Sequence, residues 1–227
     1  MTTARTIGPE FQDHLDGLAG AGPVELGPSA SHLWRTDPRR MPIVLARYKF
    51  VAKMLAGKQR ALEVGCGDGF QMRVVLQAVE SVHGVDYDPS FIDWAVSHAA
   101  KEKLNATFSV CDVIATPPPG RYEAAYSLDV IEHIPLEHEA AFLGNIASVL
   151  PADGVCIVGT PNITADAYAS KWSKAGHINL KSADTLRAAM AQHFSNVFLF
   201  SMNDEVVHTG FAPMSHYLLA MGVGVRR

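Results

Sequence analysis

The amino-acid sequence predicts an α/β fold, in which a doubly wound and mostly parallel sheet carries helices on both faces. Two observations predict it. From residue 42 onward, short apolar runs of strand length alternate with longer segments of helical periodicity, and this alternation is typical of parallel sheets with crossover helices. The chain also has 227 residues, of which 48% are hydrophobic, and this size and composition fit one α/β domain with modest additions.

The N-terminal part of the chain is predicted to differ from the rest. Residues 1–40 are rich in Gly, Pro and Ser and have no sustained period, which predicts an irregular segment with one short helix near residues 10–18. Residues 41–227 form the predicted domain. Its first helix covers 42–55, where apolar residues recur at helical spacing and Pro42 suits a first-turn position.

Strands and helices then alternate to the C-terminus. Asp88 and Pro89 mark the start of one helix, because Asp caps a helix N-terminus and Pro fits its first turn. The proline-rich stretch 116–120 reads as a loop, since Pro breaks helices and central strands. The expected strands are 60–64, 81–86, 106–111, 122–128, 154–159, 195–202 and 214–223; the expected helices are 68–79, 88–103, 136–150 and 182–193; and 160–180 and 203–211 are expected as irregular or polar loops.

Composition and charge argue against several classes of protein. The net charge of −4 and the pI of about 6.2 disfavour a nucleic-acid partner, which needs a basic surface. No apolar stretch is long enough to span a bilayer, and the N-terminus lacks the apolar region of a signal peptide. Cys66, Cys111 and Cys156 lie in or beside predicted strands, which favours buried, reduced thiols and a cytoplasmic location. The sequence does not indicate an oligomeric state.

The most informative stretch is residues 61–69, Ala-Leu-Glu-Val-Gly-Cys-Gly-Asp-Gly. An apolar strand carries the carboxylate of Glu63, and three glycines follow at alternate positions. Glycine accepts positive φ and has no Cβ, so backbone N–H groups can approach a ligand closely. A helix that begins after the turn adds the positive end of its dipole. The pattern predicts a site for a nucleotide-like ligand.

Two later acids strengthen this prediction. Asp86 ends the second strand, 21 residues after Gly65, at the spacing where a carboxylate on the neighbouring strand meets a ribose. Asp112 ends the third strand, where it can accept a hydrogen bond from an adenine amino group. Three successive strand ends are therefore expected to present Glu63 with its glycines, Asp86 and Asp112 to one crevice.

These motifs resemble those of the class I S-adenosylmethionine (SAM) dependent methyltransferases, over roughly residues 45–200. The run from Glu63 to Gly69 resembles their first motif, and Asp86 resembles their ribose-binding acid. The resemblance implies SAM as cofactor and a seven-stranded sheet whose last two strands form an antiparallel hairpin at one edge. The cofactor-binding residues it implies are Glu63, Gly65, Cys66, Gly67, Asp86, Tyr87, Asp112, Val113 and Leu128. The alternative, an NAD(P)-binding domain, expects Gly-x-Gly-x-x-Gly, which the glycine spacing fits less well.

The loop after the fourth strand, Asp129-Val-Ile-Glu-His133, lies where an acceptor would meet the cofactor. Its Glu132-His133 pair resembles one found in many small-molecule methyltransferases, including those of ubiquinone biosynthesis. We expect His133 to act as general base, with Glu132 beside it, because a neutral imidazole can take a proton from a hydroxyl or amine. Two alternatives stay open: His133 caps the next helix or bonds a carbonyl, and Glu132 only solvates the turn.

His177 follows the fifth strand within a segment that is long for a loop in a compact domain. In the ubiquinone O-methyltransferases and the small-RNA 2′-O-methyltransferases, a histidine here joins an acidic-x-x-Glu-His group to bind a divalent cation. The corresponding candidates are Asp129, Glu132, His133 and His177, with Asp129 where those families have Glu. Such a set suits Mn²⁺, Fe²⁺ or Zn²⁺ better than Mg²⁺. Without a metal, we expect His177 to contact the substrate or act as a second base.

Three further segments flank this site. The 160–180 segment is predicted to be a lid or an acceptor-binding loop. Arg47, beside Tyr48, either pairs with the methionine carboxylate of the cofactor or lies on the polar face of its helix. The 203–211 loop either lines the acceptor pocket or is a solvated hairpin.

The leading hypothesis is transfer of a methyl group from SAM to a small-molecule acceptor, with a hydroxyl favoured. The Asp-Pro-Pro-Tyr-type sequence of base- and amide-directed N-methyltransferases does not follow the fourth strand, which favours an oxygen nucleophile. Sugars, nucleotide sugars, quinone-like compounds and natural products all stay open as acceptors. The alternative hypothesis is a SAM-binding regulatory or accessory protein without catalysis.

Overall fold

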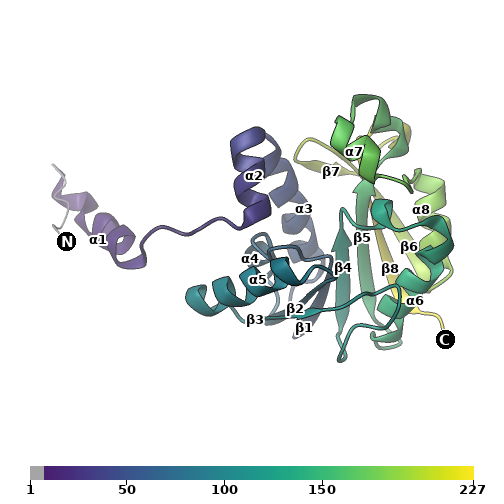
Figure 1. The fold of residues 1–227 in the computed structure, drawn as a ribbon, viewed down its shortest axis with the longest axis horizontal. Helices are drawn as coiled ribbons and strands as arrows, with labels where there is room; N and C mark the ends of the chain where they lie inside the picture. Colours follow the sequence, from purple (N-terminus) through teal and green to yellow (C-terminus); the bar gives the residue numbers. More distant parts are fainter. Residues whose placement is uncertain (1–7) are drawn as a thin grey trace.

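A computed structural model describes residues 8–227 of the chain. Its strands are β1 (Arg60–Val64), β2 (Ser81–Asp86), β3 (Ala106–Val110), β4 (Ala124–Leu128), β5 (Val155–Pro161), β6 (Phe194–Asn203), β7 (Val206–His208) and β8 (Tyr217–Val225). They form one sheet in the order β3-β2-β1-β4-β5-β8-β6-β7 (Figure 1). The pairs from β3 to β5 are parallel, whereas β8 is antiparallel to both β5 and β6, and β7 is antiparallel to β6.

The predicted α/β class and the doubly wound, mostly parallel sheet are confirmed, and so is the antiparallel edge, where β8, β6 and β7 follow β5. One detail differs. The polar loop expected at 203–211 contains β7, because the chain reverses at Asp204, where φ is 47°, and brings Val206 and Val207 beside β6. The sheet therefore has eight strands instead of seven.

The helices of the domain follow the predicted alternation in most places. They are α3 (Arg40–Met54), α4 (Met72–Val75), α5 (Pro89–Glu102), α6 (Glu139–Ser148), α7 (Lys171–Gly176) and α8 (Ala183–Ala191), with single 3-10 turns η2 (Ile131–His133), η3 (Leu136–His138), η4 (Ile163–Tyr168) and η5 (Ala212–Met214). Helix α5 begins as predicted, since the Asp88 side chain accepts a hydrogen bond from Ser90 N at 2.8 Å. None of the helices in residues 8–227 has the length and apolar character needed to cross a bilayer.

Two predictions about local structure are wrong. The helix expected at 68–79 shortens to α4, because Gly69 has φ of 69°, outside the helical region, so a helix cannot begin at Asp68. The segment 160–180, expected to be irregular, contains η4 and α7. Asn162 and Ser170 cap these two elements through their side chains, a role that both residue types favour.

The N-terminal segment contains more regular structure than predicted. After the turn η1 (Pro9–Phe11) come helices α1 (Gln12–Ala21) and α2 (Pro28–Thr36). Gly27 precedes α2 and Pro28 occupies its first position, so these residues mark a helix start and not a loop. Helix α1 extends away from the sheet, whereas α2 lies beside α3 (Figure 1). Helix α1 matches the short helix predicted near residues 10–18, whereas α2 was not predicted; residues 1–7 of the predicted irregular segment lie outside the described residues.

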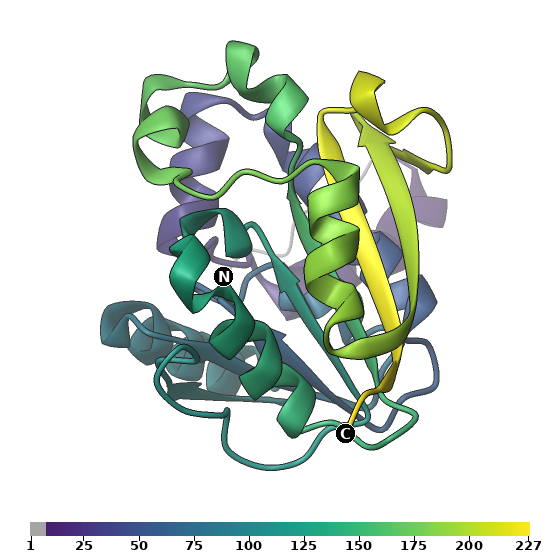
Figure 2. The same cartoon turned by 90° about the vertical axis from the view of Figure 1, so that its right-hand side faces the viewer.

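Each face of the sheet is covered by helices and has its own core. Helices α3, α4 and α5 cover one face, and α6 and α8 cover the other, where Figure 2 shows them in front of the sheet. Side chains alternate along β1: Leu62 and Val64 pack beneath α6, whereas Ala61 faces α3. This packing fixes the carboxyl ends of β1 to β5 at one edge, where ligands bind in open α/β sheets.

Candidate active site

A cavity of about 560 Å³ lies at the carboxyl ends of the parallel strands. Its wall combines the glycine turn after β1 with residues that follow β2, β3 and β4. Six of the predicted cofactor-binding residues line it: Gly65, Gly67, Asp86, Tyr87, Asp112 and Val113. The structure therefore brings together, in one cavity, the residues that the sequence placed on successive strand ends.

The glycine turn is shaped as predicted. Gly65 has φ of 75°, and a Cβ on it would lie 2.2 Å from the Val130 side chain, so only glycine fits there. The Asp86 carboxylate accepts hydrogen bonds from Gly67 N (2.9 Å) and Asp88 N (3.0 Å). Asp86 thus fixes the turn after β1 to the end of β2, and it also lines the cavity.

Glu63 lies behind the cavity wall and not in it. Its two carboxylate oxygens accept hydrogen bonds from the Tyr48 and Tyr126 hydroxyls, both at 2.8 Å. Burial raises the pKa of Glu63 to about 8, and the two hydroxyl hydrogen bonds oppose that rise. Cys66 and Leu128 are also buried and do not line the cavity. These three residues lie behind the cavity wall, and their contact with the cofactor stays a prediction.

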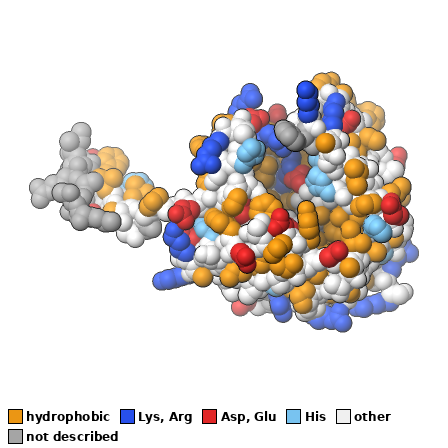
Figure 3. Space-filling model, in the orientation of Figure 1, with side chains coloured by type: hydrophobic (Ala, Val, Ile, Leu, Met, Phe, Trp, Pro, Cys, Tyr) orange, Lys and Arg blue, Asp and Glu red, His pale blue; other side chains and the backbone are white. Residues whose placement is uncertain are grey.

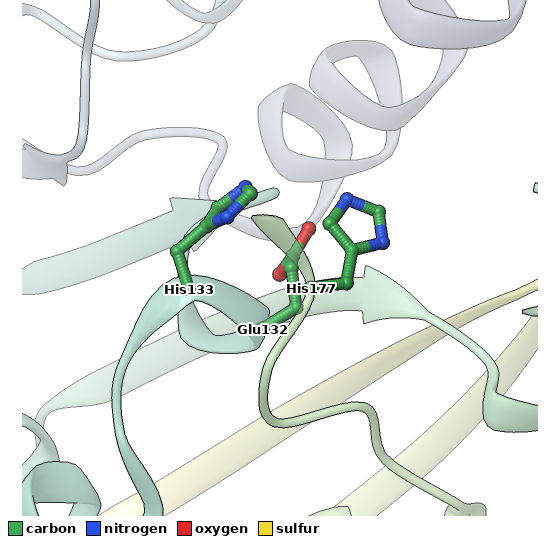
Figure 4. A group of neighbouring side chains, drawn as sticks. All are labelled: Glu132, His133 and His177. Atoms are coloured by element: carbon green, nitrogen blue, oxygen red, sulfur yellow. The ribbon is translucent and has the colours of Figure 1, made fainter. Parts of the chain in front are cut away.

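Glu132, His133 and His177 converge beside the cavity. Their ligand atoms all lie within 4.8 Å of one another, and Figure 4 shows the three side chains facing a common space. Glu132 is fully buried; its Oε2 accepts a hydrogen bond from Thr160 Oγ1 (3.0 Å), whereas its Oε1 has no hydrogen-bond partner among residues 8–227. Burial, aided by the nearby charge of Asp129, raises the pKa of Glu132 to about 8. The alternative in which Glu132 only solvates the turn is therefore wrong.

The two imidazoles are oriented by their surroundings. His133 Nδ1 lies 2.8 Å from the Gly176 carbonyl oxygen; because a carbonyl only accepts, Nδ1 carries the proton and Nε2 keeps its lone pair. The carbonyl bond that the sequence left open for His133 is thus present, and it still leaves Nε2 able to accept a proton. Burial and the neighbouring His133 lower the pKa of His177. The two imidazole rings pack edge to face, with 5.1 Å between their centroids.

Asp129 is not part of this group. It adopts the left-handed conformation, with φ of 59°, and its carboxylate pairs with the Arg47 guanidinium. Arg47 is buried and lies over the Tyr217 ring, 3.7 Å from its centroid. The four predicted metal-ligand candidates therefore reduce to Glu132, His133 and His177. Arg47 does not lie on an exposed polar face of its helix, so that alternative is wrong.

A second cavity, of about 360 Å³, lies on the other side of the histidine pair. It is enclosed by one face of α3, by the start of β8 and by the segment 161–180, which was predicted to be a lid or an acceptor-binding loop. His133 lines the first cavity and His177 lines the second. The two imidazoles thus stand between the two cavities.

Known proteins share both the sequence pattern and the fold. A methyltransferase-domain family matches residues 61–154. The ubiquinone biosynthesis O-methyltransferase of Coxiella burnetii is 27% identical over 144 residues, which are 61% of this chain and 61% of that protein's length. A SAM-dependent methyltransferase from Clostridium acetobutylicum has a TM-score of 0.69 at 8% identity, over 86% of this chain and 97% of that one. The N-methyltransferase NodS from Bradyrhizobium japonicum, in complex with S-adenosyl-L-homocysteine, has a TM-score of 0.59 at 16% identity, over 84% and 91%.

Residues 61–154 therefore match a methyltransferase domain, and the chain is similar to the class I SAM-dependent methyltransferases in sequence pattern and in fold. These similarities support SAM as the cofactor over the NAD(P)-binding alternative. The glycine turn, Asp86 and Asp112 occupy the strand ends at which the resemblance placed the cofactor.

The group formed by Glu132, His133 and His177 fits a divalent cation. Glu132 Oε1 is a buried carboxylate oxygen without a partner, and the Gly176 carbonyl fixes the His133 tautomer whose Nε2 is free to coordinate. Two imidazoles and one carboxylate suit Mn²⁺, Fe²⁺ or Zn²⁺. The same features equally suit a metal-free base, since an oriented imidazole beside a protonated carboxyl can accept a proton.

A buried ion pair that the sequence did not reveal holds the His177 segment in place. Lys181 and Glu139 are both buried and pair with each other, and Asn179 bonds to both, at 2.8 Å to Lys181 Nζ and 2.9 Å to Glu139 Oε2. Asn179 N also donates to the Glu132 carbonyl oxygen (3.0 Å). No local pattern pairs residues this far apart in the sequence, so only the fold could show this contact.

Proposed function

We propose that this methyltransferase transfers a methyl group from SAM to a hydroxyl of a small-molecule acceptor. The observation that carries the proposal is the position of the histidine pair. His133 lines the cavity formed by the cofactor motifs, and His177 lines the second cavity. An acceptor in the second cavity would meet the methyl donor at the imidazoles, which is where a hydroxyl proton must be removed.

The first cavity supplies the cofactor site in this proposal. Its volume of about 560 Å³ lies within the range of small-molecule sites. Asp86 would bind the ribose, Asp112 the adenine amino group, and the backbone at Gly65 and Gly67 the amino-acid part. Residues 41–227 would form the catalytic domain, with α2 docked on it.

The chemical step is an in-line displacement. The acceptor oxygen forms a bond to the methyl carbon as the bond from sulfur to that carbon breaks, and the sulfonium becomes a neutral thioether. The acceptor proton passes to an imidazole nitrogen, for which His133 Nε2 is available. Burial of Glu132 keeps its carboxyl largely protonated near neutral pH, so it does not compete with the imidazoles as a base. A divalent cation at Glu132, His133 and His177 would instead lower the pKa of the acceptor hydroxyl.

The proposal is tested by following labelled methyl from SAM into a panel of hydroxylated metabolites, with and without a chelator. We expect transfer to a hydroxyl oxygen of at least one acceptor. Loss of transfer with the chelator, and its recovery with Mn²⁺ or Zn²⁺, would assign a metal to the histidine group; transfer that resists the chelator would assign a base. Binding of S-adenosyl-L-homocysteine with no transfer to any acceptor would contradict the proposal and favour the regulatory alternative.

We also propose a cytoplasmic location, since the three cysteines are free and buried and such thiols are typical of reducing compartments.

A further inference from the structure

The wall of the second cavity carries two charged side chains, Arg40 and Asp166, that form no ion pair within residues 8–227. Arg40 and Arg47 lie seven residues apart on α3 and both line the cavity, as residues on one helical face do. Arg47 is paired with Asp129. Arg40 lines the same wall and forms no ion pair with any of residues 8–227. A solvent-exposed cation without an ion pair in the described part of the chain therefore lies at the cavity wall.

The opposite wall carries an acidic residue that likewise forms no ion pair with any of residues 8–227. Asp166, in η4, is half-buried, lines the cavity and has no ion pair within the described part of the chain. Ser170 and Ser173 line the cavity beside it, and Tyr168 stands at the rim with 91% of its surface exposed. The cavity thus offers a donor on one wall, an acceptor on the other, and hydroxyls between them.

These groups determine which acceptors the cavity can hold. An apolar chain packed against the exposed Arg40 and the half-buried Asp166 would remove part of their hydration without replacing the lost hydrogen bonds, which is unfavourable for charged groups. A molecule with several hydroxyls would replace those bonds, since hydroxyls both donate and accept. The exposed Tyr168 ring offers an apolar face to the C–H side of such a molecule.

The shape of the cavity agrees with this chemistry. Its volume of about 360 Å³ is near the lower end of the range of roughly 300–1,000 Å³ for ligand sites, which suits a compact polar group more than a long tail. Figure 3 shows this face hollowed between α3 and α7, with basic, acidic and histidine side chains around the opening. Both features point to a compact, hydrophilic ligand.

We propose that the second cavity binds a polyhydroxylated, sugar-like acceptor, with Arg40 and Asp166 holding its hydroxyls and His177 beside the hydroxyl that is methylated. This inference rests on the proposed function and narrows it. A sugar-like acceptor differs from the acceptor that the name of the ubiquinone biosynthesis O-methyltransferases indicates for those relatives.

The test compares two sets of acceptors in the labelled-methyl assay. One set contains hexoses, hexose phosphates and nucleotide sugars, and the other contains catechols with and without an isoprenoid tail. We expect transfer to a member of the first set. Arg40→Ala and Asp166→Asn should each raise KM for that acceptor about tenfold or more, as expected when a hydrogen bond to a charged group is lost, and should leave KM for SAM unchanged.

Matched controls replace charges of the same kind outside the cavity. Arg35→Ala on α2 and Asp184→Asn on α8 do not touch the cavity wall, so KM for the acceptor should stay unchanged. Titration of the same sugars into the protein loaded with S-adenosyl-L-homocysteine provides a second measurement that does not depend on turnover.

The outcomes separate the two proposals. Transfer to catechols but not to sugars would overturn the sugar-like acceptor and keep the methyltransferase function. Absence of both binding and transfer for every hydroxylated probe would also overturn it. Binding of a sugar with no transfer to either set would keep the cavity assignment and contradict the proposed function.

Discussion

The Arg47 Nη1 atom lies 2.5 Å from the Asp129 Oδ2 atom, and this ion pair joins helix α3 to the end of strand β4. Asp129 lines the cofactor cavity and Arg47 lines the second cavity. A residue other than glycine in the left-handed conformation costs free energy and persists where its surroundings hold it. The pair therefore holds the strained Asp129 at the boundary between the two cavities.

Breaking this pair should destabilise the protein. Arg47→Met is expected to lower the free energy of unfolding by about 2–3 kcal/mol, below the roughly 3–5 kcal/mol for a fully buried pair, because the Asp129 side chain is 37% exposed. Urea denaturation measures this change. Arg39→Ala removes an exposed pair with Asp37 and should change stability by less than about 1 kcal/mol. Equal effects of the two variants would contradict the role given to Arg47.

Asp86 should contribute directly to cofactor affinity. Asp86→Ala removes the expected ribose contact and also the hydrogen bonds to Gly67 N and Asp88 N. We expect binding of S-adenosyl-L-homocysteine to weaken by about 1–3 kcal/mol, measured by calorimetry. Asp88→Ala is the matched control, since Asp88 is an exposed helix cap and should affect stability alone. An unchanged affinity in Asp86→Ala would remove Asp86 from the site.

Stability should fall as pH rises, partly through Glu63. Its pKa is about 8 in the folded protein and 4.5 for an ordinary Glu, so between these values the folded state holds a proton that the unfolded state has lost. Stability from this group is complete below pH 4.5 and decreases as pH rises through 8. Glu63→Gln should therefore flatten the slope of unfolding free energy between pH 5 and 8 by up to about 1.4 kcal/mol per pH unit. An identical slope in the variant would show that Glu63 is ionised in the folded state.

The buried Lys181–Glu139 pair should behave as a coupled unit. Lys181→Met leaves the Glu139 carboxylate buried without its cation, and we expect a loss of about 3–5 kcal/mol in unfolding free energy. Lys181→Met combined with Glu139→Leu should recover much of this loss, because both charges are then gone. Lys174→Met, on α7 in the same segment, is the control. Additive losses in the double variant would contradict direct coupling.

The sequence predicted the parts of the site that depend on local pattern. Gly65, Asp86 and Asp112 meet in one cavity because each ends or follows a parallel strand, and the strands were recognisable from their apolar runs. Glu132 and His133 meet His177 because β4 and β5 are neighbours, so the loops after them are close.

The parts that the sequence did not predict depend on contacts between distant residues. Whether Glu63 faces the ligand or the interior is decided by Tyr48 and Tyr126, which come from α3 and β4. Asp129 does not join the other metal-ligand candidates, because its carboxylate is paired with Arg47, which lies 82 residues earlier in the sequence. Helix α2 was missed because Gly27 and Pro28, which mark its start, are also typical of loops.

The central claim is that the histidine pair carries out the transfer between the two cavities. The most direct measurement is kcat for labelled-methyl transfer by His133→Gln and His177→Gln, with the affinity for S-adenosyl-L-homocysteine measured in the same preparations. We expect kcat to fall by about 100-fold or more in at least one variant, as for loss of a general base, with the cofactor still bound. Wild-type kcat in both single variants and in the double variant would contradict the claim.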